Sequence, residues 1–157
     1  MNYLIDDFNC DQFVSIFKRA LSEKGRVDID TLDDLIKRMN QIKDIWALML
    51  PIDNNIIGFI QYQILYFSDG FFKEKYGFIR EFWIDPEYRY SGFGKKLLKD
   101  CETHIEEMGI NQFILLALPD SEGFYQKQGY RINNNYISFN NLTVMTKSKH
   151  MSEKVLI

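Results

Sequence analysis

The sequence predicts a mixed α/β (α+β) fold. Apolar residues recur at helical spacing at the start and in the middle of the chain, and the segments between them are short runs rich in β-favouring residues. With 157 residues, the chain has the length of about one domain and is long enough to bury a single hydrophobic core. We expect one domain over residues 1–147 and a flexible C-terminal tail over residues 148–157.

Two amphipathic helices are expected before the first strands. The first begins near Asp11 and ends at Gly25, since glycine commonly follows the last turn of a helix. The second begins at Thr31, because Asp34 three residues later resembles a capping box, and its apolar period continues to Met39.

A β-hairpin and a further strand follow these helices. Residues 46–50 and 56–67 are apolar and β-favouring, and the turn-forming residues 51–55 separate them. A third β run covers residues 76–84. It ends at an Asp-Pro pair, which cannot extend a ladder of strand hydrogen bonds.

The second half of the chain alternates strands and helices. Between Gly92 and Met108 the apolar residues mark a long amphipathic helix, which Gly109 ends. The remaining expected elements are a buried strand, a short helix and two late strands, over residues 112–118, 121–128, 130–139 and 142–147.

Composition excludes several classes of protein. A formal net charge of −3 argues against nonspecific binding to nucleic acid or to anionic membranes. No apolar run approaches the roughly 18–20 residues of a membrane-spanning helix. Cys10 and Cys101 form no C-x-x-C pair and the chain does not start with a secretory segment, so we expect a cytoplasmic protein. His104 and His150 lack the spacing of metal ligands, and no metal is expected.

Residues 82–96 carry the strongest functional signal, because they run from a strand through a tight turn into a helix. A helix N-terminus presents unsatisfied N–H groups and the positive end of the helix dipole, and glycines there let the backbone wrap a phosphate closely. Arg89 and Lys95 add positive charge. Two common phosphate-binding motifs fail here: G-x-G-x-x-G would need glycine at Leu97, and the P-loop would need glycine at Arg89.

The pattern that remains, Arg89-x-x-Gly92-x-Gly94, resembles the acyl-coenzyme A pyrophosphate loop of the GNAT superfamily of N-acetyltransferases. Residues 124–130, which read Phe-Tyr-Gln-Lys-Gln-Gly-Tyr, are similar to the second signature of that family. In that signature an aromatic pair is followed by a short helix that ends in glycine and an aromatic residue. The resemblance extends over residues 56–147.

The resemblance implies both a fold and a reaction. The fold would be a central, strongly bent mixed sheet flanked by helices. The protein would move the acetyl group of acetyl-CoA, its cosubstrate, to a primary amine by direct attack in a ternary complex. The acceptor would be a small-molecule amine or an amine of a peptide or protein, and relatives often form homodimers.

The resemblance also implies roles for single residues. Backbone groups of Phe82, Trp83 and Ile84 would pair with the pantetheine arm of the cosubstrate. Tyr125 would bind near the thioester sulfur as catalytic acid, and Glu81 would act as general base. The pyrophosphate would be held by Arg89, Tyr90, Ser91, Gly92, Phe93, Gly94 and Lys95.

One position departs from the family pattern. Many relatives carry Asn shortly before the tyrosine, where this chain has Leu118. The cofactor contact made by that Asn would then come from Asp120 or from Ser121, and Ser121 is included among the expected cofactor-binding residues.

The chemistry of amine acetylation requires the same groups. A lysine-like amine has a pKa of about 10.4, so at pH 7 some group must take its proton, and a positioned carboxylate contributes typically 10²–10⁴ in rate. Glu81 is the first candidate for this base, and Asp85 and Glu87 are weaker ones. A thiol has a pKa of about 8.5 and tyrosine of about 10, so Tyr125 would hydrogen-bond the sulfur first and protonate it late. A strand N–H near Trp83 would meet the developing oxyanion.

Two alternatives stay open. The chain could be a non-catalytic acyl-CoA-binding sensor or interaction domain that kept the loop and lost turnover. It could also transfer a longer acyl chain, because aromatic residues make up 15% of the sequence. Four of them, Tyr66, Phe71, Phe72 and Tyr76, flank residues 68–70 and would either wall an acceptor pocket or shield the end of a hairpin.

Overall fold

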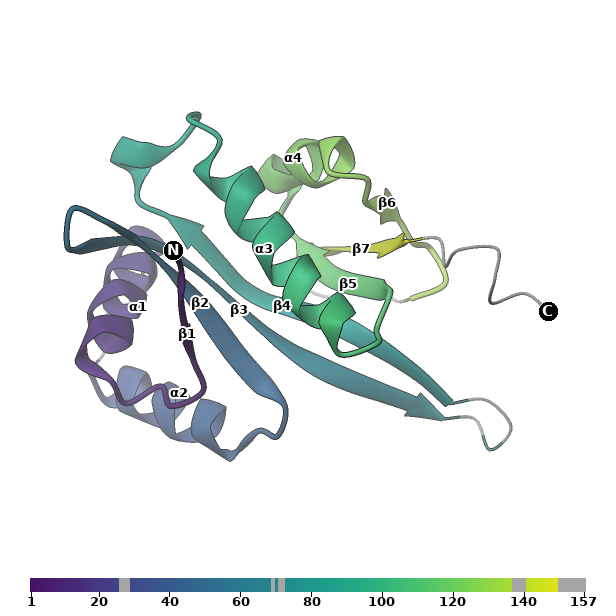
Figure 1. Ribbon diagram of the computed structural model, residues 1–157, viewed down its shortest axis with the longest axis horizontal. Coiled ribbons are helices and arrows are strands. Elements are labelled where there is room, and N and C mark those ends of the chain that lie inside the picture. Colours follow the sequence, from purple (N-terminus) through teal and green to yellow (C-terminus); the bar gives the residue numbers. More distant parts are fainter. Residues whose placement is uncertain (26–28, 69, 71–72, 137–140, 150–157) are drawn as a thin grey trace. The chain divides into compact units, whose positions relative to one another are not determined.

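Strands and helices alternate along the chain in the computed structural model, which describes residues 1–25, 29–68, 70, 73–136 and 141–149 (Figure 1). The strands are β1 (Tyr3–Ile5), β2 (Ile45–Ile52), β3 (Asn55–Ser68), β4 (Lys73–Ile84), β5 (Gln112–Ala117), β6 (Arg131–Ile132) and β7 (Thr143–Ser148). The helices are α1 (Asp11–Glu23), α2 (Ile29–Gln41), α3 (Phe93–Glu107) and α4 (Glu122–Lys127), with 3₁₀ turns η1 (Pro86–Tyr88) and η2 (Pro119–Ser121). These elements confirm the predicted mixed α/β fold.

The described strands form a seven-stranded mixed sheet in the order β1-β2-β3-β4-β5-β7-β6. Strands β4 and β5 run parallel, because α3 provides the long crossover that parallel neighbours need. The pairs β1–β2, β2–β3, β5–β7 and β6–β7 are antiparallel. The chain divides into two compact units, residues 1–63 with 81–101 and residues 64–80 with 102–157, and each unit is described by itself.

The core of the first unit lies between the helices α1 and α2 and the strands beside them (Figure 1). The rings of Phe13 and Phe17 on α1 stack with their centroids 5.4 Å apart, and both meet the ring of Phe59 on β3 edge-on. All three side chains are buried, and each contributes about 1.5–3 kcal/mol through the hydrophobic effect. This packing fixes α1 on the sheet.

The two N-terminal helices agree with the sequence in position but not in every boundary. Helix α1 begins at Asp11, as expected, and its buried residues repeat at helical spacing. Helix α2 begins at Ile29, so Thr31 lies inside the helix and the capping box predicted there was wrong. Asp30 instead provides the acidic residue of the first turn, where it favours the positive end of the helix dipole.

The predicted hairpin is confirmed as β2 and β3. Asp53 and Asn54 form its two-residue turn, with positive φ angles of 49° and 68° that short polar residues tolerate. The register pairs Ile52 with Asn55 and shifts between Leu50 and Pro51, because proline has no N–H to donate to the ladder.

The second unit is built around β5, which lies between β4 and β7. Ile105 of α3 packs closely on β4, since a Cβ added at Gly77 would lie 2.7 Å from its side chain. Strand β6 covers only Arg131 and Ile132, whereas a strand over residues 130–139 was predicted. The turn that follows Ile132 ends it, and residues 137–140 lie outside the described residues.

The secondary structure differs from the prediction at both ends of the chain. Strand β1, a three-residue strand paired with β2, was not predicted. At the other end, β7 continues to Ser148, and the Lys149 N–H donates to the Asn111 carbonyl at 2.9 Å. Residues 150–157 of the expected tail lie outside the described residues. Within the described ranges, no helix combines the length and the apolar content needed to cross a membrane.

Candidate active site

The C-terminal half of β4 extends beyond its ladder with β5. The register of the two strands ends at Ile79 and Leu115, whereas β4 continues to Ile84. On its other side this part of β4 is supported by β3, because the Asp85 N–H donates to the Ile57 carbonyl at 2.7 Å. The strand segment that is expected to meet the pantetheine arm is therefore bonded to β3 within the first unit.

A short capped turn ends β4 and sets up the following loop. Asp85 is buried, and its carboxylate accepts the Glu87 N–H at 2.9 Å, while its carbonyl accepts the Tyr88 N–H at 2.8 Å. Proline at position 86 suits the first position of this turn because its N–H would have no partner there. The Asp-Pro pair thus ends the strand as predicted.

The loop before α3 presents a row of backbone donors. Tyr90 and Gly92 have positive φ angles of 64° and 86°, and the first helical hydrogen bond runs from the Lys96 N–H to the Gly92 carbonyl at 3.1 Å. No acceptor in the described part of the chain receives the N–H groups of residues 90–95. A Cβ added at Gly92 would have no atom within 4 Å, so this side of the loop is open. Free N–H groups at the positive end of a 15-residue helix fit an anion such as pyrophosphate.

The guanidinium of Arg89 points back toward α1. Its Nη2 lies 2.7 and 2.9 Å from the two carboxylate oxygens of Glu23, and its Nε donates to the Ile84 carbonyl at 2.8 Å. The charge that the sequence suggested for the anion is thus already paired. Lys95 is exposed and has no ion pair among the described residues, so it supplies the cation of the loop.

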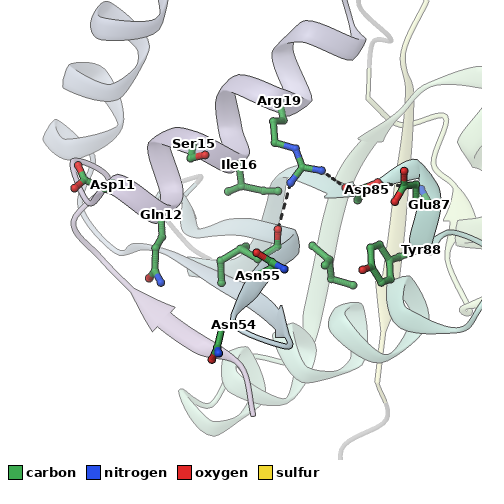
Figure 2. A pocket seen from close by; sticks show the side chains of 12 residues that line it. Asp11, Gln12, Ser15, Ile16, Arg19, Asn54, Asn55, Asp85, Glu87 and Tyr88 are labelled. Carbon is green, nitrogen blue, oxygen red and sulfur yellow. Dashed lines mark hydrogen bonds and ion pairs between the residues drawn. The ribbon is translucent and has the colours of Figure 1, made fainter.

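Two cationic side chains, one on α1 and one at its C-cap, contact the end of β4 and the residue after it. The contacted residues are Glu81, Trp83 and Asp85. The Lys24 ammonium lies 3.1 Å from the Glu81 carboxylate. The Arg19 guanidinium lies over the Trp83 ring at 5.5 Å from its centroid. The same guanidinium pairs with Asp85 (Figure 2). The buried Trp83 Nε1 has no hydrogen-bond partner within the described ranges.

Tyr125 and Ser121 belong to the second unit. Tyr125 is a buried residue of α4, and its ring meets the ring of Tyr130 with centroids 5.8 Å apart. Its carbonyl accepts the N–H groups of Gln128 and Tyr130, both at 3.0 Å, which ends α4 as the second signature predicts. Ser121 precedes α4 without a side-chain capping bond, and Leu118 is 53% exposed.

Comparison with known proteins identifies the family. The model of the Acetyltransferase (GNAT) family matches residues 9–130. The chain belongs to the GNAT acetyltransferase family. No curated protein sequence matches the chain.

Solved structures share the GNAT fold at low sequence identity. A predicted acetyltransferase from Clostridium acetobutylicum, solved with acetyl-CoA, has a TM-score of 0.75 and 20% identity, over 89% of this chain and 95% of that chain. The PaiA N-acetyltransferase from Thermoplasma acidophilum, in complex with coenzyme A, has a TM-score of 0.66 and 16% identity, over 95% and 99%. Naa50 from Arabidopsis thaliana, in complex with the bisubstrate analogue CoA-Ac-MVNAL, has a TM-score of 0.63 and 18% identity, over 94% and 99%.

A buried carboxylate in this GNAT chain was not predicted. Glu102 of α3 is 3% exposed, accepts the Tyr130 hydroxyl at 2.7 Å, and lies 3.0 Å from the Lys147 ammonium. Leu98 and Ile105 lie on the same face of α3 as Glu102. A carboxylate on an apolar helix face needs a polar partner when it is buried, and this was the signal in the sequence that could have revealed the network. The network ties α3 to β7 and to Tyr130, three residues after the end of α4.

Asp85 and Glu87, the weaker candidates for the general base, line a cavity. A cavity of about 480 Å³ on the first unit is bordered by Asp85, Glu87 and Arg19 together with residues of α1 and of the β2–β3 turn (Figure 2). None of the expected cofactor-binding residues lines it. Asp85 is engaged by Arg19 and by its own turn, and Glu81 is engaged by Lys24.

The aromatic end of the β3–β4 hairpin is only partly described. Tyr66 and Phe67 are exposed, and the rings of Phe67 and Tyr76 meet edge-on at 5.4 Å. Burial raises the pKa of the Tyr76 hydroxyl, and its hydrogen bond with Tyr136 and the charge of Glu74 act in the same direction. Phe71 and Phe72, which were expected beside them, lie outside the described residues.

Proposed function

We propose that the protein transfers the acetyl group of acetyl-CoA to a primary amine by direct attack in a ternary complex. The observation that supports this most directly is the loop of residues 90–95, whose backbone N–H groups have no acceptor in the described part of the chain. Such a loop at a helix N-terminus suits a pyrophosphate, and it carries the sequence pattern of the acyl-coenzyme A loop.

The cosubstrate would be held mainly by backbone groups. Residues 90–95 would donate to the pyrophosphate, with Lys95 adding the one charge that is not already paired on this loop. Residues 82–84 would pair with the pantetheine arm, since β4 runs past the end of its ladder with β5. Arg89 would act on the loop through its bonds to Glu23 and Ile84, and Ser121 would add a further contact to the cosubstrate.

Proton transfers would be divided between Glu81 and Tyr125. The Glu81 carboxylate would accept a proton from the acceptor amine, directly or through water, because only a neutral amine has a free electron pair. A strand N–H near Trp83 would stabilise the oxyanion. Tyr125 would donate to the leaving thiolate, and its burial fits a group that acts beside a thioester and away from bulk water.

The acceptor is proposed only as a class. Naa50 of Arabidopsis thaliana was solved with the bisubstrate analogue CoA-Ac-MVNAL. We propose that the acceptor of this protein is likewise an amine, carried by a small molecule, a peptide or a protein. We also propose residues 1–147 as one N-acetyltransferase domain that acts in the cytoplasm, since Cys10 and Cys101 are both free thiols. Neither nucleic acid nor membrane is needed in this scheme.

Thermal unfolding with candidate ligands tests the cofactor site first. Acetyl-CoA and coenzyme A at 100 times their dissociation constants should stabilise the fold by about 2.7 kcal/mol, whereas NAD and ATP should not. Thiol release with a panel of primary amines then tests turnover. Binding without thiol release for any amine would favour the non-catalytic acyl-CoA-binding domain, and no binding at saturation would reject both functions.

A further inference from the structure

The side chain of Lys24 lies on the carboxylate that the proposed reaction uses as its base. Its Nζ is 3.1 Å from the Glu81 Oε2, and this is the contact that the structure gives to both side chains. Lys24 is 41% exposed at its side chain and Glu81 is 35% exposed, so the pair is open to solvent and to a ligand. A lysine side chain is itself a primary amine, the acceptor class of the proposed function.

The position of Lys24 is fixed by the neighbouring contacts of α1. Glu23, the preceding residue, is bound through both oxygens to Arg89, which in turn bonds the Ile84 carbonyl. Five residues before Lys24, Arg19 pairs with Asp85. The C-terminal end of α1 is therefore attached to Ile84, Asp85 and Arg89, which follow Glu81, and Lys24, the C-cap residue of α1, reaches the Glu81 carboxylate.

We propose that Lys24 is a self-acetylation site, an inference that rests on the proposed function. The Lys24 ammonium passes one proton to Glu81, and the neutral nitrogen attacks the thioester carbonyl of acetyl-CoA bound along the adjacent strand residues. The C–N bond forms and the C–S bond breaks. The second nitrogen proton ends on the coenzyme A thiolate, and Glu81 releases the first to water. The products are an N-acetyl-lysine and free coenzyme A, and no oxidant or metal takes part.

Acetylation of Lys24 would change the site as well as the residue. The amide carries no charge, so the ion pair with Glu81 is lost and its carboxylate becomes available to an external ammonium. Lys24 in its free form occupies the place of an acceptor ammonium. Self-acetylation would therefore convert a self-blocked enzyme into one that accepts external amines.

The experiment compares a lysine of α1 with the lysine at its C-cap in the same sample. The full chain is incubated with acetyl-CoA and no acceptor, and the acetylated fraction of each lysine is followed by peptide mass spectrometry. Lys18 serves as internal control, because it is exposed on α1 and has no ion pair among the described residues. We expect acetylation of Lys24 at least about tenfold faster than of Lys18, since a positioned base contributes typically 10²–10⁴. Excess coenzyme A should suppress only the reaction at Lys24.

Three further measurements make the result decisive. The first-order rate at Lys24 should not depend on protein concentration, because the reaction occurs within one molecule. Glu81→Gln should lower the rate at Lys24 to that at Lys18, with folding checked by the thermal midpoint. Lys24→Arg keeps a cation beside Glu81 and should remove the fast mass increase without a change in coenzyme A binding.

The same samples separate this inference from the proposed function. Equal rates at Lys24 and Lys18, together with thiol release from added amines, would overturn self-acetylation and leave the acetyltransferase intact. A rate at Lys24 that rises with protein concentration would overturn it as well, because the reaction would then run between molecules. Absence of coenzyme A binding, of thiol release and of acetylation would reject both proposals.

Discussion

The hydroxyl of Tyr130 donates a 2.7 Å hydrogen bond to the carboxylate of Glu102, and both side chains are buried. The ammonium of Lys147 lies 3.0 Å from the same carboxylate and 5.4 Å from the centre of the Tyr130 ring. The buried carboxylate thus has a hydroxyl donor and two cations as partners, since the Lys149 ammonium also lies 3.6 Å from it, and these partners offset the cost of taking a charge out of water. It joins α3 and β7 to Tyr130, three residues after the end of α4.

Replacement of Glu102 tests how much this network stabilises the second unit. Glu102→Ala leaves the Lys147 ammonium, which is 18% exposed, without its carboxylate. Removing one partner of a buried pair costs about 3–5 kcal/mol, so we expect the free energy of unfolding in urea to fall by about 3 kcal/mol. Glu106→Ala is the comparison, because Glu106 pairs at the surface with Lys149, which keeps Glu102 at 3.6 Å as a second partner, and its loss should cost less than about 1 kcal/mol. Equal losses in the two variants would contradict the role of the buried carboxylate.

Most helices and strands could be predicted because the pattern of apolar residues extends over many positions in each of them. Helix α3 and strand β5 carry apolar residues at nearly every expected position, and the structure places them within a residue or two of the prediction. Strand β1 was missed because three residues hold too short a pattern, and it forms only by pairing with β2. Thr31 was misread as a cap because a local motif does not reveal that helix α2 extends further toward the N-terminus.

The loop of the site could be predicted, but its side-chain partners could not. Gly92 and the Asp-Pro pair act through backbone conformation, which a short stretch of sequence encodes. Arg89 meets Glu23 across 66 residues of sequence, and Lys24 meets Glu81 across 57. No local pattern relates such distant residues, so the pairing of both predicted site residues with α1 came only from the structure.

Gly92→Ala tests the cofactor loop against a matched glycine at the other end of α3. Gly92 and Gly109 have φ angles of 86° and 83°, and a Cβ at either position would have no atom within 4 Å. Both alanine variants should therefore lose about 1 kcal/mol of stability through backbone strain. Only Gly92→Ala should also lower coenzyme A affinity, measured by calorimetry, because only its loop would hold the pyrophosphate. A similar loss of affinity in Gly109→Ala would show that strain in α3, and not the loop, sets binding.

Tyr125→Phe tests the catalytic acid. The ring stays in place and only the hydroxyl is lost, so turnover should fall roughly 10- to 1,000-fold with little change in coenzyme A affinity. Tyr130→Phe is the control, because its ring lies 5.8 Å from that of Tyr125 and its hydroxyl bonds Glu102. That variant should lose about 1.5–3 kcal/mol of stability and keep its turnover below the unfolding temperature. Unchanged turnover in Tyr125→Phe would remove the tyrosine from the mechanism.

Glu81→Gln tests the general base through the pH dependence of kcat/KM. With the carboxylate present, the acceptor amine loses its proton inside the site, and the reaction runs at a pH where the free amine is mostly charged. With glutamine, the neutral amine must come from solution, where its fraction rises tenfold per pH unit up to a pKa of about 10.4. The pH optimum should therefore move upward, and the loss of activity should be larger at pH 7 than at pH 9. Lys24→Met is the comparison, because it removes the cation from Glu81 and keeps the carboxylate, so its optimum should not move upward. A Glu81→Gln profile that parallels wild type at all pH values would assign the base to another group.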